Sequence, residues 1–102
     1  MGKVVWTERA SRHLNEIFDY IAKNSKVYAE RLVKSLIAAT SRLEQMPFSG
    51  RSVPELTPLD FRELVHGNYR IVYHVLEITS DVEVLAVIHG ARDFKKVFDN
   101  PD

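Results

Sequence analysis

The sequence of 102 residues has no cysteine, and its 14 basic side chains are offset by 14 acidic ones. The lack of cysteine excludes disulfide bonds and a thiolate nucleophile, and it suits a reducing cytoplasm, which is the location that we predict. The lack of a net charge removes the long-range positive field that a dedicated phosphate-backbone binder uses. We therefore expect that the chain on its own does not bind DNA specifically.

Long apolar runs are also missing. No stretch approaches the roughly 20 apolar residues of a membrane-spanning helix, and the first residues show no signal-peptide core, so we expect no membrane contact. His13, His66 and His74 show no metal-ligand spacing among themselves, so we expect no metal, and we expect no cofactor. The length suits a single domain over residues 1–102, in which 91–102 form a tail that is either a short helix or flexible.

Apolar residues recur at helical spacing in the first half of the chain. They predict a helix over residues 8–23, which Thr7 caps because its hydroxyl can accept a free amide of the first turn. A second helix, capped by Ser25, is predicted to run through residue 45, because Pro47 bars its continuation. The few residues between the helices allow only a turn, so the two form an antiparallel hairpin.

Apolar and polar residues alternate in the second half, over residues 61–92, and predict three antiparallel strands with tight turns. The odd positions of the run 69–75 share one face, which we expect to be core, and the even positions share a partly polar face. A short strand at residues 4–6 precedes the helices. The predicted class is α+β, with an N-terminal strand and a helical hairpin packed on a curved, mainly antiparallel sheet, in the order β-α-α-β-β-β.

Between the helices and the strands, residues 47–58 contain three of the four prolines and form the only extended loop that we expect. A loop of this length in a small domain is more often functional or partner-facing than idle. The loop holds two candidate site residues, Arg51 and Glu55.

Four segments in this order and at these separations resemble the RelE/ParE superfamily of toxins from bacterial toxin-antitoxin modules. The segments are Trp6 to Ala22, Pro47 to Glu55, Arg62 to Tyr73 and Val87 to Arg92. The resemblance covers nearly the whole chain, and it implies the fold described above together with an antitoxin that wraps the toxin. It also implies one of two activities: RelE-like members cut mRNA on the ribosome, whereas ParE-like members inhibit DNA gyrase.

RNA cleavage by a 2′-hydroxyl needs a base, an acid and cations for the phosphorane charge. The resemblance to the nucleases implies Arg70 as the cation and Glu55 as the base. Those nucleases carry His and Tyr just past the last strand, where this sequence has Ala91 and Arg92, which are not proton carriers at neutral pH. His89 is a substitute, because His titrates in the useful range. The ending of the last strand is nevertheless more similar to ParE.

Arg70 has two interpretations, one functional and one structural. A two-residue turn at Gly67-Asn68 places Arg70 on the face of Glu63, where an exposed ion pair would contribute about 0.2–1 kcal/mol. A three-residue loop that includes His66 places Arg70 beside Arg62 instead. Arg62 is itself either a solvated strand charge or an antitoxin contact.

These observations favour a ParE-like toxin, of the branch that includes plasmid stabilisation proteins, which inhibits DNA gyrase by protein-protein binding and is neutralised by a cognate antitoxin. We predict that Arg51, Arg62, Arg70 and Arg92 bind the antitoxin or the target. One alternative is a RelE-like endonuclease that acts on mRNA in the ribosome through Arg70, Glu55 and His89. A second alternative is a degenerate member that binds an antitoxin but is not toxic.

Overall fold

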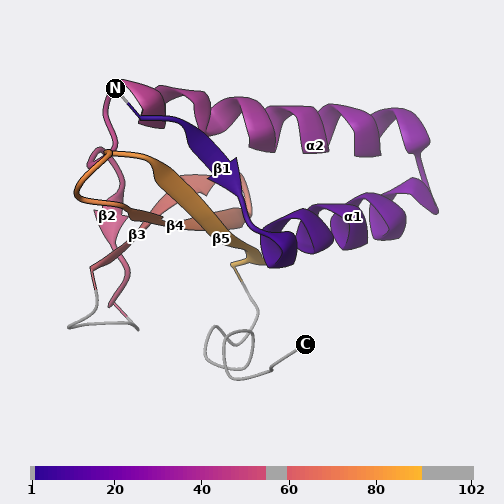
Figure 1. Cartoon of the computed structure of the whole chain (residues 1–102). Coiled ribbons are helices and arrows are strands. Elements are labelled where there is room, and N and C mark those ends of the chain that lie inside the picture. Colours follow the sequence, from indigo (N-terminus) through magenta and orange to yellow (C-terminus); the bar gives the residue numbers. More distant parts are fainter. Residues whose placement is uncertain (1, 55–59, 91–102) are drawn as a thin grey trace.

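The computed structural model describes residues 2–54 and 60–90, and Figure 1 shows α1 and α2 running antiparallel, with their connection far from the strands. The elements are β1 (Val4–Trp6), α1 (Glu8–Ala22), α2 (Lys26–Ala39), a 3-10 helix (Ser41–Glu44), β2 (Arg51–Ser52), β3 (Phe61–His66), β4 (Tyr69–Val75) and β5 (Val82–His89). The predicted fold class is confirmed, with the short strand β2 added to the predicted order. The predicted tail, 91–102, lies outside the described residues.

The five strands form one sheet in the order β1-β5-β4-β3-β2. Only β1 and β5 are parallel, with Val4 opposite Val82, and the other neighbours are antiparallel. The pairing of β4 with β5 shifts by one residue after Val72, so that Leu85 is an extra residue in β5. Such a bulge turns the side chains beyond it to the opposite faces.

Thr7 joins β1, α1 and the bulge. Its backbone amide and its hydroxyl both donate to the carbonyl of Val84, at 3.0 and 2.9 Å. The same hydroxyl accepts the amide of Ala10 at 3.1 Å, which is the predicted cap of the first helix. Ser25 accepts the amide of Tyr28 at 3.1 Å and caps α2 in the same way. Both predicted caps are therefore confirmed.

The second helix ends earlier than predicted, at Ala39 rather than at residue 45. The hydroxyls of Thr40 and Ser41 donate to the carbonyls of Ile37 and Ala38, at 2.7 and 2.8 Å. Hydroxyls that bond back to the preceding turn compete with the regular helical pattern. The chain continues from residue 41 to 44 as a tighter 3-10 helix.

The turn between β3 and β4 has two residues, Gly67 and Asn68, and places Val65 opposite Arg70. Gly67 has a φ of 59°, which a residue without a Cβ adopts at little cost. This result decides between the two registers that the sequence left open. Arg70 lies on the same face as Glu63.

The sheet buries apolar side chains on both faces. The larger cluster packs against the helices, and its strand members include Ile71, Tyr73 and Val75, as the alternation predicted. A smaller cluster on the other face contains Val53, Val72, Ala86 and Ile88, with Phe61 packed against it. Within the described ranges, no helix has the length and apolarity that a membrane crossing requires.

Candidate functional site

A buried carboxylate on the face of the sheet away from the helices binds two arginines. Glu63 on β3 lies opposite Arg51 on β2, and its Oε2 accepts from Arg51 Nε at 2.5 Å. Its Oε1 accepts from Arg70 Nε on β4 at 2.6 Å. The Glu63 side chain is fully buried, whereas those of Arg70 and Arg51 are 13% and 64% exposed. We call these three residues the arginine clamp.

The clamp shows that Arg70 pairs with Glu63, which is one of the two alternatives that the sequence left open, but the pair is buried rather than exposed as expected. Arg51, which was expected in a loop, lies on the edge strand β2 and reaches the same carboxylate. Two guanidinium groups around one carboxylate leave a single positive charge. The clamp is thus a buried ion network with one exposed cationic end.

The segment that leads into β2 is held at two points. Gly50 donates its amide to the hydroxyl of the buried Tyr73 at 2.8 Å. Arg62 donates to the carbonyls of Phe48 and Gly50, at 3.3 and 3.0 Å, and its guanidinium carbon lies 5.0 Å from the centroid of the Phe48 ring. These contacts fix the position of Gly50, the residue before Arg51. This role of Arg62 was not anticipated from the sequence.

The structure places His89 beside Tyr69, a partner that was not expected from the sequence. The two rings meet edge to face with centroids 5.4 Å apart, across the pairing of β4 with β5. Both residues line a hollow of about 380 Å³. Its other lining residues are Arg51, Val65, Gly67, Asn68, Arg70 and Gly90. We call this hollow the arginine pocket.

Three of the predicted site residues, Arg51, Arg70 and His89, line the arginine pocket, but the two arginines lie on the face away from the helices, whereas the His89 ring packs with Tyr69 on the helix face. Arg62 is not among its lining residues, and its side chain bonds to residues 48 and 50 instead. Glu55 and Arg92 lie outside the described part of the chain. The contact between Tyr69 and His89 could not be predicted from the sequence, because it depends on the register of two strands.

A second hollow of about 490 Å³ lies between α1 and the ends of β4 and β5. Its lining residues are His13, Glu16, Ile17, Tyr20, Tyr69, Val87 and His89. The Nδ1 atom of His13 accepts the amide of Val87 at 3.1 Å, which leaves the proton of the neutral ring on Nε2. His13 thus helps to attach α1 to β5.

The remaining histidines have structural partners. The Nε2 atom of His66 lies 3.1 Å from the hydroxyl of Ser35 and links β3 to α2. His74 lies 3.9 Å from the carboxylate of Glu83 and packs edge-on against Phe61. Among residues 2–54 and 60–90, no three His, Asp or Glu side chains are grouped as metal ligands.

Tyr69 gives a testable dependence of stability on alkaline pH. Burial raises the pKa of Tyr69 above its ordinary value of 10.0, and the nearby Tyr28 and Tyr20 raise it further. A group with a raised folded-state pKa contributes stability that is complete below its unfolded pKa and is lost as the pH rises through the folded pKa. We expect urea unfolding to show a smaller loss of stability between about pH 9 and pH 11 for Tyr69→Phe than for the wild type. An equal loss would contradict this prediction.

Comparisons with known proteins agree on one family. The model of the family described as ParE toxin of type II toxin-antitoxin system, parDE, matches residues 4–94. The chain is 36% identical to Y4kP of Sinorhizobium fredii, over 93% of this chain and 95% of that protein. It is 37% identical to toxin RelE2 of Caulobacter vibrioides, over 90% of this chain and 99% of that protein. A chain of the chromosomal ParDE TA system from P. aeruginosa has a similar fold, with a TM-score of 0.73 and 21% identity, over 87% of this chain and 96% of that one.

Proposed function

The chain belongs to the ParE toxin family of type II toxin-antitoxin systems, and from this membership we propose that it inhibits DNA gyrase by protein-protein binding. A cognate antitoxin neutralises it. The chain acts in the cytoplasm, where gyrase and the antitoxin are available. Arg51 and Arg70, with Arg62 and Arg92, are the side chains proposed to receive the antitoxin or the target.

The pairing of Arg70 is the observation that carries this proposal. In a nuclease this arginine would stabilise the charge of the phosphorane, and it would do so best with its own charge uncompensated. Here Arg70 is nearly buried and shares Glu63 with Arg51. The arrangement favours recognition of another protein over stabilisation of a highly charged transition state.

Two assays on the purified free chain test the proposed function. We expect loss of supercoiling by DNA gyrase and intact mRNA on programmed ribosomes, with supercoiling restored by the antitoxin. The matched control is the same chain after incubation with the antitoxin. Normal supercoiling at a molar excess of a well-folded chain would contradict the proposal.

A specific observation also favours the RelE-like alternative, in which the chain cuts mRNA on the ribosome. His89 and Tyr69 are in contact on the helix face of the sheet, so that a ring able to carry a proton lies beside a phenol at the edge where the arginine pocket opens on the other face. Cleaved mRNA with normal supercoiling would favour this second function. If neither assay responds while the antitoxin still binds, the chain is a non-toxic member of the family.

A further inference from the structure

We propose that the arginine pocket is a receptor for an acidic side chain of a protein partner, and that Glu63 is the positioning residue that holds Arg51 and Arg70 for this purpose. The inference rests on the proposed function insofar as it needs a protein partner, the antitoxin. To that function the inference adds which residues of the chain receive the acidic side chain and how these residues are held in place.

Glu63 cannot itself touch a partner, because its side chain has no exposed surface. Each of its carboxylate oxygens accepts from the Nε atom of one arginine. A guanidinium has five N–H groups in a rigid plane, so a bond through Nε fixes the direction in which the Nη groups point. The Arg51 side chain is 64% exposed, so its remaining N–H groups are accessible to a ligand.

A prearranged guanidinium binds a carboxylate at a lower entropic cost than a mobile one. Arg51 would otherwise be a long side chain on a two-residue edge strand. Its Nε bond to Glu63 restrains the side chain, and the anchored segment before it restrains the backbone, through Gly50 and Tyr73. The receptor is thus fixed before any partner arrives.

The charge and lining of the pocket favour a carboxylate over a nucleic-acid backbone. The exposed guanidinium of Arg51 offers one positive charge, which matches a single acidic side chain. Val65, whose surface is 59% exposed, lies opposite Arg70 on the same face and lines the pocket, so an apolar residue beside the acidic one also finds a contact. A phosphate backbone carries a charge at every nucleotide and is usually followed by a track of cations.

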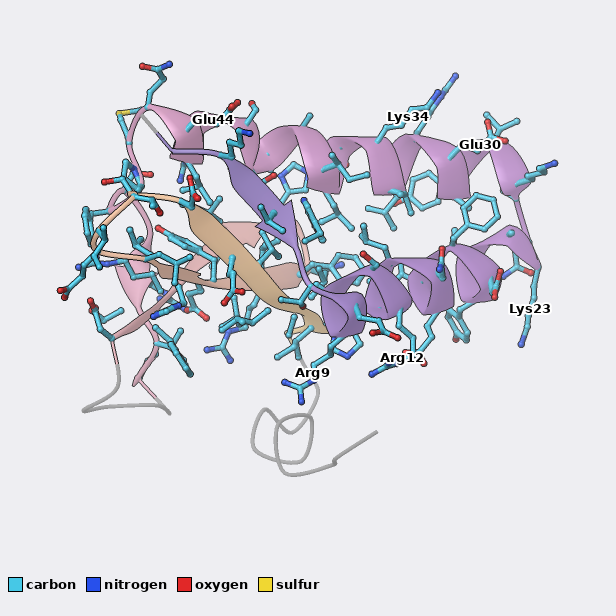
Figure 2. All side chains as sticks on the ribbon, in the orientation of Figure 1. Arg9, Arg12, Lys23, Glu30, Lys34 and Glu44 are labelled. Carbon is cyan, nitrogen blue, oxygen red and sulfur yellow. The ribbon has the colours of Figure 1, made fainter. Side chains whose placement is uncertain are left out.

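Binding of the full chain to its cognate antitoxin, measured by calorimetry at physiological salt, tests the inference. Arg51→Gln is expected to weaken binding about tenfold, and Arg51→Lys is expected to do nearly the same, because it keeps the charge but loses the planar donor group. Lys34→Gln is the matched control: Lys34 points away from the sheet on the outer side of α2 (Figure 2), and its loss should change the affinity less than twofold.

Glu63→Gln separates positioning of the arginines from simple charge attraction, because the two predict opposite changes in affinity for the antitoxin. The variant gains a positive charge, so a diffuse cationic patch would bind the antitoxin more tightly. A positioned receptor instead binds about tenfold more weakly, since both arginines lose the carboxylate that orients them. Thermal unfolding of each variant shows whether it is folded, and Arg51→Lys, at an exposed position, carries the test if Glu63→Gln does not fold.

Three results would overturn the inference alone. Arg51 variants that bind like Lys34→Gln would show that the pocket is not the receptor, and tighter binding by Glu63→Gln would show that positioning is irrelevant. Displacement of the antitoxin by a single-stranded RNA oligonucleotide, dependent on Arg51, would assign the pocket to nucleic acid. These readouts do not involve gyrase, so a failure of gyrase inhibition leaves the inference standing. A wild-type chain that binds no antitoxin would contradict the proposed function and this inference together.

Discussion

Replacing Glu63 with glutamine is expected to lower the free energy of unfolding by about 3 kcal/mol, which is the low end of the range for breaking a buried ion pair from one side. The amide keeps an acceptor oxygen but no charge. Arg70, with only 13% of its side chain exposed, then stays buried beside a neutral group, and Arg51 loses the same partner. Urea unfolding monitored by circular dichroism measures the loss.

Two further variants make this result specific to the clamp. Glu30→Gln removes a carboxylate from the outer side of α2 and should cost less than about 0.5 kcal/mol, as exposed substitutions usually do. The double variant Glu63→Gln with Arg70→Met should be more stable than Glu63→Gln alone, because it also removes the buried charge that has lost the Glu63 carboxylate. A cost for Glu63→Gln no larger than that of Glu30→Gln would mean that the clamp contributes nothing to stability.

Replacing Gly50 with alanine is the second change for which we expect a large loss, about 3 kcal/mol, or a fall of roughly 15 °C in Tm. A Cβ at Gly50 would lie 2.5 Å from the hydroxyl oxygen of Tyr73 and 2.6 Å from the backbone carbonyl oxygen of Glu63. Neither atom can move freely, because Tyr73 is fully buried and the carbonyl belongs to a strand. The substitution also strains the hydrogen bond from the Gly50 amide to Tyr73.

The matched control is Gly90→Ala, where an added Cβ would meet, among the described residues, only the carbonyl oxygen of Asn68, at 3.3 Å. We expect this variant to lose less than about 1 kcal/mol, because the neighbouring turn needs to yield only slightly. Combining Gly50→Ala with Tyr73→Phe should restore only part of the stability, since the contact with the Glu63 carbonyl remains. Equal losses for Gly50→Ala and Gly90→Ala would contradict the close approach at Gly50.

The parts of the fold that depend on neighbouring residues were predictable from the sequence. The two helix starts follow from the hydroxyls of Thr7 and Ser25, each of which bonds to an amide three residues later. The face of β4 that meets the core follows from simple alternation. By contrast, β2 has only two residues, too few to show any period, and its pairing depends on a strand ten residues away.

The candidate site was only partly predictable, for a similar reason. Glu63 and Arg70 flank a two-residue turn, so their pairing was one of two registers that the sequence allowed. The meeting of Tyr69 with His89 instead depends on the extra residue Leu85 in β5. Without that bulge Tyr69 would lie opposite Ile88, and His89 would fall on the other face, because a shift of one residue reverses the side chains.

The parallel pairing of β1 with β5 also has a consequence for biosynthesis. The backbone amide of Lys3 donates to the side chain of Asp81 across 78 residues of sequence, and Val4 lies opposite Val82. While the chain is being translated, β1 cannot pair within the sheet until β5 has left the ribosomal exit tunnel. The helical hairpin, made of local contacts, can form long before that moment. The order of synthesis therefore makes closure of the sheet a late event. Until then the nascent chain can have its helices formed, but its arginine pocket is still incomplete.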